Sequence, residues 1–105
     1  MEDIDKKLDE LLALAKKTKE YSIKCKEAAR SYEIDVAEKL LEECRETYEK
    51  MAMKLEELAK AENLSNNQKP SMKHVYVNDQ VALATSILEA AETFLEIYKR
   101  LGKTE

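Results

Sequence analysis

The chain has 105 residues and a net charge of −4 at pH 7; 44% of its residues are apolar and 38% are charged. One glycine and one proline are too few for the turns of a small all-β fold, and abundant Lys and Glu are typical of long amphipathic helices. Acidic and basic residues are interspersed, which argues against nucleic-acid binding, and no apolar run approaches the roughly 18 residues of a membrane span.

Apolar residues recur in alternating steps of four and three along three segments of the chain. Such steps place the side chains on one stripe of an α-helix. The register shifts between the first and the second segment, which predicts a turn near residues 31–35. The stripes are Ile4, Leu8, Leu11, Ala15, Thr18, Ser22, Cys25, Ala29, Tyr32 and Val36; Ile34, Ala37, Leu41, Cys44, Tyr48, Met51, Leu55 and Leu58; and Val77, Val81, Ala84, Leu88, Ala91, Leu95 and Tyr98.

The first helix is predicted over about 3–31, where acidic residues at its start favour the positive end of the helix dipole. The second is predicted over 35–62, because Asp35 and Glu38 fit a capping box. No glycine marks the connection between them, so it must be a tight turn or a kink. A bent but continuous helix across 31–35 is the alternative.

Residues 63–70 form the one polar segment that contains a proline, and they are predicted to be a loop. The third helix then begins at Ser71 or at Asn78 and runs to 101, with Gly102 at the position where a left-handed residue ends a helix. Short connections make neighbouring helices antiparallel. We therefore expect a single all-α domain over 1–105, an elongated, antiparallel up-down-up three-helix bundle.

Cys25 and Cys44 lie on predicted stripes, and a turn near residue 35 places them at the same height of a helical hairpin. Two buried thiols acting as small apolar side chains are the simplest interpretation for a reducing cytosol. A disulfide and half of a metal site are the alternatives. A Cys₂His zinc site would need His74, which the predicted topology places roughly 24 Å from the level of Cys44.

The sequence offers no recognisable catalytic site. His74 is the single histidine; we expect it to be exposed near a helix start, and its sequence neighbours supply no Ser-His-Asp or Cys-His arrangement. Carboxylates lie off the stripes, in pairs such as Glu46 and Lys50 with the i,i+4 spacing of a solvated helix face. The glycine-rich loop and His-Glu-x-x-His motifs do not occur. We therefore expect no enzyme, no cofactor and no metal.

The third helix carries a second apolar stripe beside the first. Burial of both stripes between two neighbouring helices is the simpler interpretation. The alternative is that part of the second stripe stays exposed and pairs with another chain, which Thr18 and Ser22 support because they make the covering stripe of the first helix thin. The second stripe consists of Leu83, Ile87, Ala90, Phe94, Ile97 and Leu101.

These patterns predict a small, acidic, cytoplasmic and non-enzymatic interaction module that self-associates or docks a helical protein partner through the third helix, in a coiled-coil-like manner. The first alternative is a redox- or metal-responsive protein that uses Cys25 and Cys44. The second is an inhibitor or immunity-type protein, since bacteriocin immunity proteins and phage-encoded inhibitors are similar in size and helical character. The interface residues expected are Leu83, Ile87, Phe94, Ile97 and Leu101, with Phe94 as the anchor.

Overall fold

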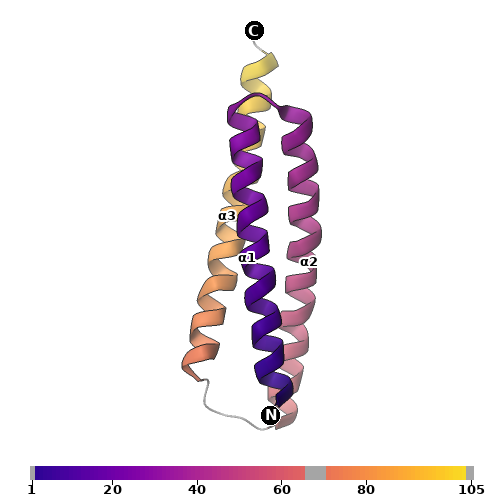
Figure 1. Cartoon of the computed structure of the whole chain (residues 1–105), viewed down its shortest axis with the longest axis vertical. Helices are drawn as coiled ribbons and strands as arrows, with labels where there is room; N and C mark the ends of the chain where they lie inside the picture. Colours follow the sequence, from indigo (N-terminus) through magenta and orange to yellow (C-terminus); the bar gives the residue numbers. More distant parts are fainter. Residues whose placement is uncertain (1, 66–70, 104–105) are drawn as a thin grey trace.

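The computed structural model describes residues 2–65 and 71–103, which form three α-helices. They are α1 (Glu2–Arg30), α2 (Ile34–Ser65) and α3 (Met72–Lys103). The chain runs up, down and up again, and the molecule is a rod of 59 × 18 × 16 Å (Figure 1). The predicted elongated, up-down-up three-helix bundle is confirmed.

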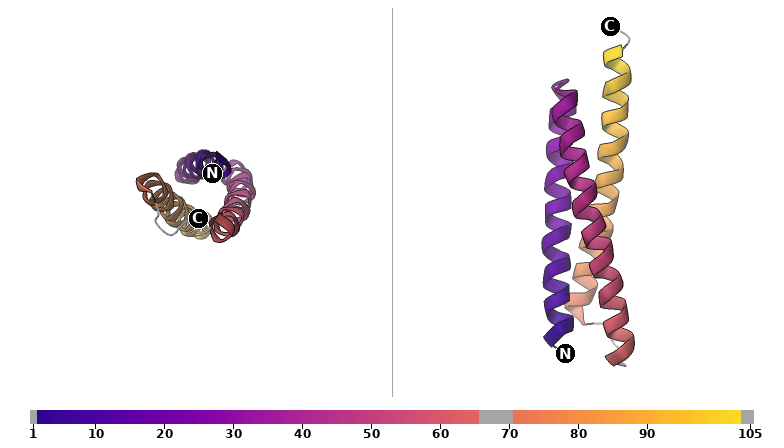
Figure 2. Two further views of the ribbon diagram at one scale, coloured as in Figure 1. Left: turned by 90° about the horizontal axis from the view of Figure 1, so that it is seen from below. Right: turned by 90° about the vertical axis from the view of Figure 1, so that its right-hand side faces the viewer.

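α1 is the helix that holds the bundle together. It packs extensively against α2 and α3, whereas α2 and α3 make far fewer contacts with each other. The three helices wind gently about one another along the rod (Figure 2). In this order of helices α1 and α3 run parallel, and α2 is antiparallel to both.

The first connection, residues 31–33, confirms the predicted turn and excludes a continuous helix across this region. Tyr32 N donates to Ala29 O at 2.9 Å and Glu33 N donates to Ala28 O at 2.9 Å, the hydrogen-bond pair of a Schellman motif. Tyr32 takes the left-handed position of this motif, with a φ of 58°. Glycine usually fills this position. Because Tyr32 fills it in this protein, the sequence has no glycine to mark the turn.

α2 begins at Ile34, so the predicted capping box of Asp35 and Glu38 is wrong. Glu33 O accepts the hydrogen bond from Ala37 N at 2.9 Å and thereby starts the helix. Asp35 lies in the first turn, where its charge still complements the helix dipole. Glu38 instead contacts α3, with Oε2 at 3.0 Å from Lys99 Nζ.

The boundaries of the predicted loop 63–70 need correction, because α2 continues to Ser65; residues 66–70 lie outside the described part of the chain. Ser71, not Asn78, precedes α3: Ser71 Oγ accepts from His74 N at 3.2 Å, as a helix cap does. The far end also differs from the prediction. Gly102 is helical rather than left-handed, and α3 continues to Lys103.

The predicted stripes form the core, with three exceptions. Tyr32 and Val36 are exposed because the turn carries them off the stripe, and Leu55 is 36% exposed. Thr18 and Ser22 are fully buried, and each hydroxyl donates at 2.8 Å to the carbonyl four residues before it. The core has two clusters: Ile4, Leu8, Leu11, Ala15, Met51, Leu58, Val77 and Ala84; and Cys25, Ala29, Ala37, Leu41, Cys44, Leu88, Ala91 and Leu95.

Polar contacts join α2 to α3 along the rod. Arg45 Nη2 lies 2.8 Å from Glu92 Oε2, and Lys99 Nζ lies 3.0 Å from Glu38 Oε2. The partial exposure of Leu55, which the stripe pattern directs inward, agrees with the sparse packing between these two helices. None of the described helices combines the length and apolar content needed to cross a membrane.

Candidate functional site

The second apolar stripe of α3 is called the outer stripe here, and the structure places it on the flank of α3 that borders α1. Phe94 establishes this placement, because Lys26 Nζ of α1 lies 5.3 Å from the centre of its ring. The stripe is partly covered. Leu83, Ile97 and Leu101 are 46%, 49% and 47% exposed, whereas Ile87 and Phe94 are half-buried. One edge of the stripe therefore packs against α1 and the other edge faces solvent.

Phe94 belongs to a short row of aromatic side chains at the upper end of the rod. Its ring lies 4.9 Å from that of Tyr98, and Tyr98 meets the edge of Tyr32 at 5.4 Å. Aromatic pairs at these distances add to the stability gained by burial alone. Phe94 is thus held in place by neighbours from both α1 and α3 while part of its side chain remains accessible.

The apolar surface continues from the outer stripe onto α1. Ile23 is 50% exposed and lies between Lys19 and Lys26, both of which reach α3: Lys19 Nζ donates to Gln80 Oε1 at 2.6 Å. Tyr76, four residues before Gln80, is 54% exposed and extends the spacing of the stripe toward the start of α3. From its place off the core stripe, the sequence predicts Ile23 as part of a small contact patch, but it does not place Ile23 or Tyr76 beside the outer stripe, because that depends on the pairing of α1 with α3.

The structure brings Cys25 and Cys44 into the same core cluster, both as fully buried free thiols. Cys44 Sγ lies 3.1 Å from Ser22 Oγ and donates to Thr18 O at 3.3 Å. Desolvation by burial raises the pKa of both thiols above the usual value. Because the thiolate is the reactive form, this environment disfavours thiol chemistry in the folded state.

His74 is buried, so the expectation of an exposed histidine is wrong. Its Nδ1 lies 2.8 Å from Ser71 Oγ, and its Nε2 lies at ion-pairing distance from Glu62 Oε2, although without the alignment of a hydrogen bond. The histidine therefore connects the end of α2 to the start of α3. Because Ser71 caps the helix that carries His74, we interpret the group as a structural junction.

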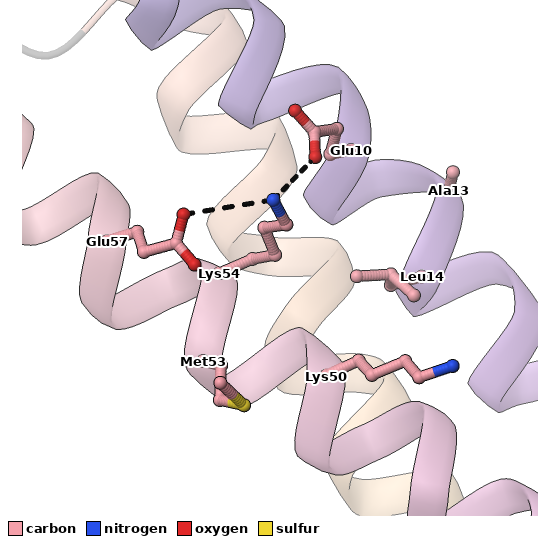
Figure 3. A pocket seen from close by; sticks show the side chains of 7 residues that line it. All are labelled: Glu10, Ala13, Leu14, Lys50, Met53, Lys54 and Glu57. Atoms are coloured by element: carbon pink, nitrogen blue, oxygen red, sulfur yellow. Dashed lines mark ion pairs between the residues drawn. The ribbon is translucent and has the colours of Figure 1, made fainter.

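A second surface feature is a shallow groove of about 390 Å³ between α1 and α2 (Figure 3). Leu14 and the 63% exposed Met53 supply apolar surface. Lys54 crosses the groove, with Nζ 2.8 Å from Glu10 Oε2 and 3.7 Å from Glu57 Oε1. The hydrogen bond between Lys54 and Glu10 holds the pKa of Glu10 below its usual value and the pKa of Lys54 above it.

Within residues 2–65 and 71–103, no cluster of three or more His, Cys, Asp or Glu side chains has the arrangement of a metal site. Comparison of the chain with protein-family models, with curated proteins and with solved structures gives no match. The candidate site therefore rests on the geometry of the outer stripe and its surroundings.

Proposed function

We propose that this protein is a non-enzymatic binding module that docks a helix of another polypeptide on the outer stripe of α3. The observation that carries the proposal is the distribution of exposed apolar side chains. α3 holds six of the eleven large hydrophobic residues that are exposed in the described part of the chain, and Leu83, Ile97 and Leu101 share one row. Scattered exposed apolar residues are ordinary, but an aligned row is typical of an interaction surface.

A helix is the partner structure that the spacing favours. Steps of four and three are the pattern by which one helix packs its side chains between those of another. Ala90 lies at the middle of the row, where its small side chain allows close approach of a second backbone. From Leu83 to Leu101 the row covers about 27 Å, or roughly five helical turns.

The proposal includes a cytoplasmic location and no catalytic role. Two buried cysteines without a disulfide are typical of proteins from reducing compartments. Their raised pKa values support this protein-binding function over the redox-responsive alternative, because thiols that stay protonated react slowly.

The test compares two sets of glutamate substitutions on opposite sides of the molecule. Leu83→Glu with Ile97→Glu changes the outer stripe, and Met53→Glu changes the groove between α1 and α2; all three side chains are about half exposed or more. The probe is a designed 21-residue helical peptide with leucines at steps of four and three and glutamines elsewhere. Binding is followed by chemical-shift changes in the labelled protein, and folding by circular dichroism.

We expect the peptide to shift the signals of residues around 83–97 and to lose at least tenfold in affinity for the Leu83→Glu/Ile97→Glu variant, while Met53→Glu binds normally. A variant that loses its helicity would show that Leu83 and Ile97 are structural. Binding that depends on Met53 alone would assign the site to the groove between α1 and α2 instead.

A further inference from the structure

We propose that the helix docked on the outer stripe carries a row of carboxylates along one flank, because a row of cations on α1 borders that stripe. This inference rests on the proposed function and specifies the chemistry of the partner. Lys16, Lys19, Ile23, Lys26 and Arg30 follow steps of three and four, so they share one flank of α1. Two contacts direct this flank toward α3: Lys19 Nζ to Gln80 Oε1 at 2.6 Å, and Lys26 Nζ over Phe94.

The row and the stripe lie at the same height on the rod. α1 and α3 run parallel, and the contacts of Lys19 with Gln80 and of Lys26 with Phe94 place the middle of the row beside residues 80–94 of α3. The row from Lys16 to Arg30 rises about 21 Å, so it lies beside the stripe from about residue 80 to residue 94. A helix seated on the stripe would place one of its flanks directly beside them.

These four cations differ from the other basic residues between the helices. Lys54 between α1 and α2, Lys73 between α1 and α3, and Lys99 between α2 and α3 each lie within 3.0 Å of a carboxylate oxygen of a neighbouring helix.

Within the described residues, Lys16, Lys19, Lys26 and Arg30 form no ion pair, and the contacts made by Lys19 and Lys26 are with a neutral amide and an aromatic ring. The nearest acidic residues on α1 by spacing, Glu20 and Glu27, are exposed and lie farther round the helix, away from the outer stripe. The positive charges of the row are therefore available to pair with carboxylates of a partner.

A second copy of this chain fits the surface less well. If two α3 helices paired antiparallel about a two-fold axis, the two α1 helices would lie on the same side of the interface, and their cationic rows would repel each other. In a parallel pair, the row would meet the neighbouring flank of the other α3. That flank carries Asp79, Ser86, Thr93 and Arg100, which supply a single carboxylate and not a row. Charge complementarity thus favours a different, acidic helix.

The experiment uses two designed 21-residue peptides that share the leucine stripe. One has glutamates at the flanking positions and the other has lysines. Affinities for the full protein are measured by fluorescence anisotropy at 50 mM and 500 mM NaCl. We expect the glutamate peptide to bind at least tenfold tighter at low salt and this preference to shrink at high salt, since screening weakens exposed charge pairs.

Two charge-reversal variants isolate the row. Lys16→Glu with Arg30→Glu changes the two exposed members of the row. Lys17→Glu with Lys24→Glu is the matched control, because both lysines are exposed on α1, lie outside the row by helical spacing and give the same change in net charge. The first variant leaves two cations and two carboxylates in the row, so it is expected to lose the preference for the glutamate peptide, and the control is expected to keep it. Circular dichroism verifies that both variants are folded.

The outcomes separate this inference from the proposed function. Equal binding of both peptides, abolished in each case by Leu83→Glu/Ile97→Glu, would overturn the acidic partner and leave the docking site intact. No binding of either peptide would overturn both. A dimer in light scattering that Leu83→Glu/Ile97→Glu dissociates would identify a second copy as the occupant. Binding to vesicles of phosphatidylserine and phosphatidylcholine in place of the peptides would assign the surface to a membrane.

Discussion

Tyr32 has a backbone conformation that few residues other than glycine adopt readily. Its φ of 58° places it in the left-handed region, where the Cβ of an L-residue approaches the following carbonyl. The Schellman hydrogen bonds of residues 32 and 33 keep it there. The ring compensates in part by its edge contact with Tyr98.

A pair of substitutions separates the backbone cost from the ring contact. Tyr32→Gly and Tyr32→Ala both lose the ring, but glycine tolerates the left-handed conformation. We expect the glycine variant to be about 1 kcal/mol more stable than the alanine variant in urea denaturation. At the exposed helical position Lys24 the order should reverse, with alanine more stable by about 1 kcal/mol. The same order at both positions would contradict the left-handed turn.

The buried thiols predict how stability changes at alkaline pH. Burial raises the pKa of Cys25 and Cys44 in the folded state. As the pH rises above the ordinary thiol value of about 8.5, the unfolded chain releases these protons while the folded protein still binds them. The free energy of unfolding should therefore be unaffected by the thiols below that pH and should fall above it.

The measurement is urea denaturation at pH 7.5 and pH 9.5 in the presence of a reductant. Cys25→Ala/Cys44→Ala lacks both thiols, and we expect it to lose less stability between the two pH values than the unsubstituted protein. The interhelical lysines with raised pKa values, Lys54, Lys73 and Lys99, are present in both proteins and cancel in the comparison. Equal losses would show that the thiols are not desolvated.

At the level of whole helices, α2 packs more extensively against α1 than against α3. It shares core side chains such as Met51 and Leu58 with both neighbours, but its contacts with α3 are fewer and include ion pairs with exposed partners, such as Arg45 with Glu92. Exposed ion pairs of this kind contribute roughly 0–1 kcal/mol each. The connection between α2 and α3 is accordingly weaker than either connection to α1.

Two leucines on the same stripe of α2 test this difference. Leu58 is 2% exposed and Leu55 is 36% exposed. Leu58→Ala should cost about 2–5 kcal/mol of unfolding free energy, as buried leucines do, and Leu55→Ala less than half of that cost. Thermal or urea denaturation of the two variants provides the comparison. Similar losses would mean that α2 and α3 close over Leu55 in solution.

The sequence predicts each helix well because helical periodicity is local, but it does not tell which neighbour covers a stripe. Leu55 fits the apolar spacing of α2 as well as Leu58 does, yet the arrangement of α3 leaves it accessible. The structural role of His74 escaped prediction for the same reason, since its contact with Glu62 crosses between two helices. Tyr32 escaped because a tyrosine is not a usual signal for a left-handed turn.

At the scale of the whole molecule, the outer stripe could be predicted as a row of residues but not as a surface. Leu83, Ile97 and Leu101 were identified from spacing, whereas the half-burial of Ile87 and Phe94 depends on how closely α1 approaches. The position of the cationic row beside the stripe could not be predicted, because it depends on the alignment of two helices that are far apart in sequence. Pairing between distant segments is the information that a periodic pattern lacks.

The up-down-up course of the chain separates the first residues of α1 from the last residues of α3. The first residues of α1 and the last residues of α3 lie at opposite tips of a body 59 Å long (Figure 1). Two groups attached at these tips would be held apart by nearly the full length of the rod. The side of the rod between them would remain accessible to a binding partner.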